Sequence, residues 1–229
     1  MAVLSRSYGY LFIQAPRTGC TAIAEGVLYP YLDGVDIPPE DVYDAHGRLV
    51  LMRKHCKLSE LTRHGALTED EAGRLFTFSA VRNPFDSLVS LYVKMRSEYA
   101  EMLDDGDAWV GRDPRFVAGI RFAMDHTFPE WVEYRLGRSR ARSLASKFRT
   151  GTPGGSHVDG MDFVMRFECL QEDFNAVLHR MRVREEFLIP RINPTEGREG
   201  DYRAYYNPRA RKIVERAFRD RLDRFGYSF

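Results

Sequence analysis

Three features are scarce in this sequence of 229 residues: cysteine, excess charge and long apolar runs. Cys20, Cys56 and Cys169 are too few and too scattered for a disulfide framework, and they lack the spacing of metal ligands. Lysine and arginine number 34 against 33 acidic residues, which excludes a general polyanion-binding surface such as a nucleic-acid interface. No run of about 18 apolar residues occurs, and the opening residues lack the apolar core of a secretion signal. We therefore expect reduced thiols, a cytoplasmic location and no membrane insertion.

The size and balance of the chain favour a folded enzyme or binding protein of ordinary proportions. Hydrophobic residues make up 44% and charged residues 29%, which excludes a disordered chain. The length suits one core, and no repeat or linker divides it. We expect a single domain over residues 1–229, with any attraction for an anion confined to a local site.

Short apolar runs alternate with segments of helical periodicity along the chain. The expected strands are 8–14, 49–52, 76–81 and 161–167. The expected helices are 20–32, a segment after residue 58, 68–75, 84–102, 116–126, 128–136, 168–181 and 208–225. This alternation predicts an α/β fold with right-handed βαβ units and a mainly parallel sheet that helices cover on both faces. Ligands of such sheets bind beyond the carboxyl ends of the strands.

The stretch IQAPRTGCTAI, residues 13–23, joins the first expected strand to a helix. A tight turn at this place aims free backbone N–H groups and the positive end of the helix dipole at one point. Arg17 adds charge, Thr18 and Thr21 add hydroxyl donors, and Gly19 lets the backbone approach an anion before the helix starts near Cys20. The turn therefore predicts a phosphate or sulfate site, although a glycine is also common in purely structural turns of this kind. It lacks the Gly-Lys pair of the nucleotide triphosphatase loop, which disfavours triphosphate hydrolysis.

A second group of polar residues lies in SAVRNPFDSLVSLYVK, residues 79–94. Arg82 follows an expected strand, and Ser90 lies two turns along the helix that Asn83 is expected to cap. Both are placed to meet a second phosphate at the sheet edge. Taken singly, Arg82 also suits a surface salt bridge and Ser90 an ordinary helix-face hydroxyl, so only the combination indicates a ligand.

Together these two segments resemble the 5'-phosphosulfate loop and the 3'-phosphate motif of sulfotransferases that use 3'-phosphoadenosine 5'-phosphosulfate (PAPS). The motif R-N-P-[FY]-D-x-x-x-S-x-Y stands here as residues 82–86, Ser90 and Tyr92. RKHCKLSEL, DFVMRFECLQEDF and YYNPRARKIVERAFRDRLDRFGYSF extend the resemblance to the carbohydrate-type (sulfotransferase family 2-like) branch and its bacterial relatives, in the family's order. Residues 95–160 match poorly, and we expect a variable, substrate-facing helical segment there.

The resemblance implies a P-loop-like three-layer sandwich and a PAPS-dependent sulfotransferase that moves the sulfuryl group to a hydroxyl of an acceptor, preferably a saccharide or a small metabolite. The product would be adenosine 3',5'-bisphosphate, and no metal is implied. His55 follows an expected strand and holds the position of the branch's catalytic histidine, so we take it as the base; Glu168 is the alternative. Arg198, in a loop that resembles the branch's cofactor-closing loop, is a further phosphate contact. The implied cofactor-binding residues are Arg17, Thr18, Gly19, Cys20, Thr21, Arg82, Ser90 and Arg198.

One position departs from the family, which usually has lysine where this chain has Arg17. Arginine keeps the positive charge but does not give up its proton, so Arg17 suits charge stabilisation rather than protonation of the leaving group. Two alternatives remain open: a nucleotide kinase-like phosphotransferase, and a protein that binds adenosine bisphosphate without catalysis. The sequence does not indicate an oligomeric state.

Overall fold

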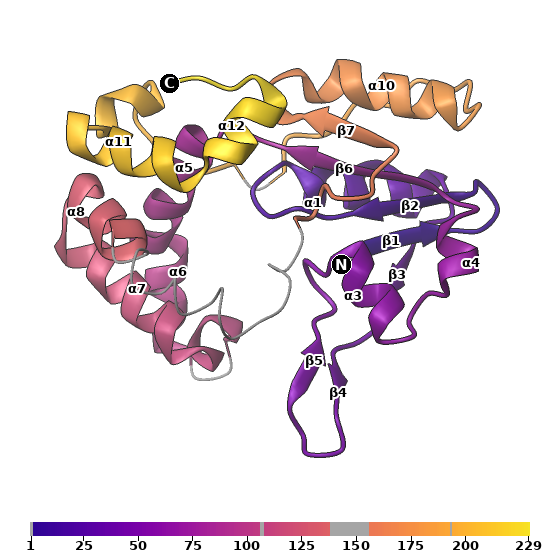
Figure 1. Cartoon of the computed structure of the whole chain (residues 1–229), viewed down its shortest axis with the longest axis horizontal. Helices are drawn as coiled ribbons and strands as arrows, with labels where there is room; N and C mark the ends of the chain where they lie inside the picture. Colours follow the sequence, from indigo (N-terminus) through magenta and orange to yellow (C-terminus); the bar gives the residue numbers. More distant parts are fainter. Residues whose placement is uncertain (1, 106–107, 138–155, 193) are drawn as a thin grey trace. The chain divides into compact units, whose positions relative to one another are not determined.

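The computed structural model describes residues 2–105, 108–137, 156–192 and 194–229 (Figure 1). The chain divides into two compact units. The first unit comprises Met1–Arg82 and Gly154–Asn193, and the second comprises Asn83–Pro153 and Pro194–Phe229. The single-domain assignment stays a prediction. Within the expected substrate-facing segment, residues 106–107 and 138–155 lie outside the described residues.

The first unit is built on a five-stranded sheet of order β3-β1-β2-β6-β7 (Figure 1). Its strands are β1 (Ala2–Ser5), β2 (Tyr10–Ile13), β3 (Val35–Ile37), β6 (Phe76–Val81) and β7 (Phe163–Arg166). β2, β6 and β7 are parallel neighbours, whereas β1 is antiparallel to both β2 and β3. β3 therefore runs in the same direction as β2, and only β1 is reversed. The mainly parallel sheet expected from the sequence is confirmed, but β1 and β3 were not anticipated.

Helices cover both faces of this sheet because its central strand is apolar on both sides. All four residues of β2 are buried. Tyr10 and Phe12 join one core cluster, and Leu11 and Ile13 join another, as the alternation of side chains along a strand requires. The first cluster packs against the helical stretch α1 (Cys20–Ile23), η1 (Ala24–Leu28) and α2 (Tyr29–Tyr31), and against α10 (Leu170–Arg180). The second packs against α3 (Leu58–Arg63).

The expected strand at residues 49–52 does not belong to the central sheet. β5 (Leu49–Leu51) pairs with β4 (Val42–Tyr43) in a separate two-stranded antiparallel sheet. Leu51 is buried but Leu49 is exposed, so this strand has one apolar side, whereas a central parallel strand needs two. His55 does follow a strand, as expected, but the expectation that this strand joins the mainly parallel sheet is wrong.

Helix starts agree with the expected caps. The Thr68 hydroxyl accepts from the Glu71 N–H at the start of α4 (Glu69–Ala72), Asn83 accepts from Phe85 N–H at α5 (Pro84–Arg96), and Asn207 accepts from Ala210 N–H at α11 (Pro208–Ala217). Helix ends agree less well. The expected helix 84–102 breaks at Ser97, whose hydroxyl donates to Val93 O one turn earlier, a contact that bends helices.

The second unit is helical. Besides α5 and α11 it contains α6 (Glu98–Glu101), η2 (Met102–Asp104), η3 (Trp109–Arg112), α7 (Pro114–Asp125), α8 (Phe128–Val132), η4 (Glu133–Gly137), η6 (Tyr202–Tyr205) and α12 (Arg219–Phe225). Phe85, Val89, Ile120, Trp131 and Val214 form its fully buried centre. In the part of the chain that the structure describes, no helix combines the length and apolar character needed to cross a bilayer.

A close contact fixes the helical stretch that follows the Gly19 turn. A Cβ built on Gly26, in the π-helical η1, would lie 2.4 Å from Cδ and Cγ of Pro190. Only glycine therefore allows the Pro190 ring to pack on this helix. The described glycines near η6, α4 and α3 would accept a Cβ without such a close contact. The segment after α10 is thus held against the stretch that begins at the turn.

We expect Gly26→Ala to lower the free energy of unfolding by about 1–3 kcal/mol, because the added methyl overlaps a rigid proline ring. Gly119→Ala is the matched control: its Cβ would lie 3.9 Å from Met95 Cε, and alanine favours a helix by up to about 1 kcal/mol. Urea denaturation of both variants measures the difference. Equal stability of the two variants would contradict the contact.

Candidate functional site

The turn after β2 is held in a conformation that glycine alone adopts without strain. Arg17 and Gly19 both have left-handed backbone angles, with φ of 67° and 73°. A Cβ on Gly19 would also lie 2.8 Å from Leu170 Cδ2, so packing and conformation both require glycine here. Left-handed residues in a turn create the concave backbone arrangement that binds anions in many proteins. A strained non-glycine residue such as Arg17 is typical of functional sites.

Two of the side chains expected to bind the anion are engaged within the turn or buried. The Thr18 hydroxyl, 4% exposed, donates to Ala15 O at 2.8 Å, so its hydrogen is committed to closing the turn. Cys20 is the first residue of α1, and burial raises the pKa of its thiol, which keeps it protonated. These residues can therefore offer backbone groups, while the half-buried Thr21 retains an accessible side chain.

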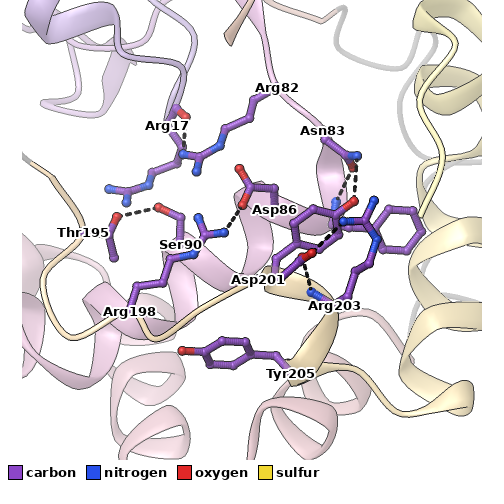
Figure 2. Close-up of polar contacts among 12 residues, drawn as sticks. Arg17, Arg82, Asn83, Asp86, Ser90, Thr195, Arg198, Asp201, Arg203 and Tyr205 are labelled. Carbon is purple, nitrogen blue, oxygen red and sulfur yellow. Dashed lines mark hydrogen bonds and ion pairs between the residues drawn. The ribbon is translucent and has the colours of Figure 1, made fainter. Parts of the chain in front are cut away.

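Arg82 lies against the same turn. It follows β6, the parallel neighbour of β2, so the carboxyl ends of both strands meet at one edge of the sheet. Its Nη1 donates to Arg17 O at 3.1 Å (Figure 2), and its guanidinium lies 4.0 Å from the centre of the Phe167 ring. Stacking on an aromatic face fixes the plane of the guanidinium. Arg17 and Arg82, expected from distant segments, are thus brought together.

His55 is hydrogen-bonded to the residue that follows β2, although the strand before His55 lies outside the central sheet. Its Nδ1 lies 2.9 Å from Gln14 O. A carbonyl oxygen only accepts, so Nδ1 carries the hydrogen and the lone pair of the neutral ring is on Nε2. Burial lowers the pKa of His55 to about 4, an effect that the bond to Gln14 O opposes but does not cancel. The imidazole is consequently neutral at physiological pH and able to accept a proton at Nε2.

A second histidine orients the first. His55 has φ of 63°, a left-handed conformation that costs a residue with a side chain about 1–2 kcal/mol. His157 Nε2 donates to His55 O at 2.7 Å and holds this backbone in place. His157 and Phe167 were not selected from the sequence, because neither lies in a motif that indicates such a contact. Only the expected cluster of polar residues around them was a signal.

One short piece of backbone therefore gathers the groups of interest in the first unit. The carbonyls of Gln14, Ala15 and Arg17 accept hydrogen bonds from His55, Thr18 and Arg82, respectively. We call the set formed by residues 14–19, His55 and Arg82 the strand-end cluster. It combines a neutral imidazole, two arginines and a turn with left-handed residues. The cluster lies at the carboxyl edge of parallel strands, where ligands bind in α/β proteins.

Ser90 and Arg198 lie in the second unit, on one face of α5 (Figure 2). Ser90 is fully buried, and its hydroxyl is 2.8 Å from that of Thr195. Arg198 Nη2 is 2.5 Å from Asp86 Oδ1, one helical turn before Ser90. These two contacts hold the loop 194–200 on α5. Thr195 was missed by the sequence analysis because a lone threonine in a loop carries no signal. The expected phosphate-binding roles of Ser90 and Arg198 stay predictions.

Glu168, the alternative base, lies in the short helix η5 (Phe167–Cys169), where its side chain is exposed. It belongs to the first unit, as does the strand-end cluster. Its catalytic role stays a prediction, and His55 remains the better candidate because its free nitrogen is defined by a hydrogen bond.

Comparison with known protein families shows to which family this chain belongs. A model of the sulfotransferase family, family 2, matches residues 2–228. The chain belongs to the sulfotransferase family. Neither the curated proteins nor the solved structures gave a match. Family membership supports a transferase that moves a sulfuryl group to a hydroxyl-bearing acceptor, and sulfotransferases generally use PAPS as the donor. In this family member the match includes both the strand-end cluster and the loop on α5.

We expect Arg198→Gln to lower the free energy of unfolding by about 1–3 kcal/mol, because the Asp86 carboxylate, 13% exposed, loses its ion-pair partner. Asp86→Asn in the same chain should recover most of this loss, since no charge is then left uncompensated. Arg203→Gln is the control, because its ion pair with Asp201 is half exposed and should change stability by less than about 0.5 kcal/mol.

Urea denaturation measures these stabilities, and nucleotide affinity of the double variant separates the two possible roles of Arg198. A folded double variant with weakened binding of adenosine 3',5'-bisphosphate supports a direct phosphate contact. Unchanged affinity assigns Arg198 to holding the loop alone.

Proposed function

We propose that this protein is a PAPS-dependent sulfotransferase that transfers the sulfuryl group to a hydroxyl of a saccharide or a small metabolite. The observation that carries the proposal is the strand-end cluster, in which a neutral imidazole and an oriented arginine are hydrogen-bonded to the backbone of one anion-binding turn. Sulfuryl transfer, like phosphoryl transfer, needs alignment and neutralisation of spreading negative charge more than covalent chemistry by the protein.

The residues of the turn fit an anionic donor. The left-handed backbone at Arg17 and Gly19, the helical stretch that follows Cys20 and the guanidinium of Arg82 together offer N–H donors and positive charge. When bound, PAPS supplies an activated sulfuryl group whose leaving group is a stable phosphate. Arg17 and the backbone N–H groups of the turn would hold the phosphosulfate end and stabilise the charge that develops there.

His55 would act as the general base. Nε2 of His55, the nitrogen that the bond to Gln14 O leaves with the lone pair, would take the proton of the acceptor hydroxyl. His157 is a positioning residue, because it contacts the His55 carbonyl and not the reacting atoms. Arg17 keeps its proton throughout, so in this scheme charge stabilisation replaces protonation of the leaving phosphate.

We expect Arg82→Lys to weaken binding of adenosine 3',5'-bisphosphate by at least about tenfold, although the charge is kept. Lysine lacks the planar fork that stacks on Phe167 and donates to Arg17 O. Calorimetric titration measures the affinity. Arg6→Lys is the control, because Arg6 is exposed, pairs with Glu71 and lies in the turn between β1 and β2. Equal affinities of the two variants would remove Arg82 from the binding site.

We expect His55→Ala to lower kcat by about 100-fold or more in an acceptor screen with radiolabelled PAPS, with nucleotide affinity little changed. His64→Ala, an exposed histidine at the end of α3, is the control. Because His55 acts in its neutral form and its pKa is about 4, kcat/KM of the unaltered protein should stay high at pH 5 and fall only as the pH drops towards 4. An acid limb near the ordinary histidine pKa of 6.5 would contradict a buried base.

The same experiments separate the two alternative functions. Nucleotide binding without turnover of any acceptor, unaffected by His55→Ala, would identify a protein that binds adenosine bisphosphate without catalysis. Phosphoryl transfer from ATP that requires magnesium would identify a phosphotransferase. Either result would replace the proposed sulfotransferase activity.

A further inference from the structure

The second unit contains a pocket that includes no residue of the strand-end cluster. It has a volume of about 1290 Å³ and is lined by residues from the end of α7, α8, η4 and α11. All of its lining residues belong to the second unit, so the pocket is defined within one compact body. Sites for small molecules usually enclose about 300–1,000 Å³, and this one therefore has room for a ligand of several rings.

One wall of the pocket is cationic. Arg209, Lys212 and Arg216 lie at three- and four-residue intervals along α11, so they share a face of the helix, and all three line the pocket. Arg209 forms an ion pair of 2.9 Å with Glu133. Among the residues that the structure describes, neither the Lys212 nor the Arg216 side chain has a hydrogen bond or ion pair. Two positive charges therefore face the pocket without a partner in the described part of the chain.

The acidic residues of the pocket, Glu130 and Glu133, offset only part of the charge of Arg209, Lys212 and Arg216. Glu133 is taken by Arg209. Glu130 Oε2 accepts from both the backbone N–H and the hydroxyl of Thr127, at 2.8 and 2.7 Å, in the capping box of α8. The bond from the Thr127 hydroxyl, and after it the bond from the Thr127 N–H, lowers the pKa of Glu130. The carboxylate therefore caps the start of α8 in its ionised form. The charge left for a ligand to neutralise is positive.

A stack of flat rings also lines the pocket. The Phe122 ring lies parallel to His126, with centres 3.7 Å apart and planes at 5°, and parallel to Tyr134, with centres 4.1 Å apart and planes at 9°. All three residues line the pocket. His126 Nδ1 is 3.0 Å from Phe122 O, which fixes the orientation of its ring. Aligned rings present a flat, rigid apolar surface on which another flat ring can pack.

We propose that this pocket binds an organic anion that carries a flat ring system, with Lys212 and Arg216 holding the anionic group and the Tyr134–Phe122–His126 stack packing against the ring. Because cations and aromatic rings line the same pocket, a ligand that contacts both needs an anionic group and a flat ring. The proposal does not rest on the sulfotransferase activity, since no residue of the strand-end cluster takes part. A carboxylate, a sulfate or a phosphate on the ring satisfies the same chemistry.

The test uses naphthalene-2-carboxylate as the probe, titrated calorimetrically into the full-length protein. Naphthalene-2-carboxamide, which has the same rings without charge, and acetate, which has the charge without rings, separate the two contributions. We expect binding of the carboxylate and at least tenfold weaker binding of the amide and of acetate, because a charge-assisted hydrogen bond is worth about 1.5–3 kcal/mol. Comparable affinity of the amide would overturn the anion contact, and comparable affinity of acetate would overturn the ring contact.

Variants then assign the binding to the pocket. Lys212→Gln with Arg216→Gln should weaken the carboxylate by at least about tenfold, since both side chains are exposed and their loss spares the core. Arg219→Gln is the matched control, an exposed cation of α12 that does not line the pocket. Tyr134→Leu, which removes the outer ring but keeps an apolar side chain, should weaken binding several-fold. Unchanged affinity in the Lys212 and Arg216 double variant overturns the proposal.

Discussion

The strand-end cluster depends on the backbone carbonyls that follow β2. Gln14 O, Ala15 O and Arg17 O accept from His55, Thr18 and Arg82, so the turn, the imidazole and the guanidinium are positioned by a common reference. That reference is rigid because every residue of β2 is buried between two core clusters. A cluster assembled on main-chain atoms directly after a fully buried strand has little freedom to move, which is the requirement for aligning a nucleophile with a leaving group.

Residues of the R-N-P-F-D motif make contacts that stabilise the fold, besides any contact with a ligand. Asn83 caps α5 and also donates to Ser228 O at 2.9 Å, while Phe85 packs edge-on against Tyr206 and Phe229. Asp86 and Ser90 hold the loop 194–200 through Arg198 and Thr195. The F-G-Y-x-F ending of the chain is thereby tied to the motif within the second unit. This explains why both segments recur together in the resemblance, since each packs on the other.

Local signals in the sequence predicted local structure well. Asparagine and threonine caps located the starts of α4, α5 and α11, because a cap is a contact between residues two or three apart. The continuous apolar run of β2, and the mostly apolar segment of β6, predicted buried parallel strands. The same reasoning misplaced residues 49–52, since a short apolar run does not specify which sheet a strand joins, and it missed β1, whose pairing with β2 is a tertiary choice.

The sequence by itself determined the element types, the turn at residues 14–19, the family and the identity of His55, Arg17 and Arg82 as candidates. Tertiary structure alone decided how these residues are used. The bonds of Arg82 to Arg17 O, His55 to Gln14 O and His157 to His55 O span 65, 41 and 102 residues. The free nitrogen of His55, its lowered pKa and the pocket on α11 arise from such contacts. They follow from how buried faces pack, and packing of distant segments leaves no periodic trace in the chain.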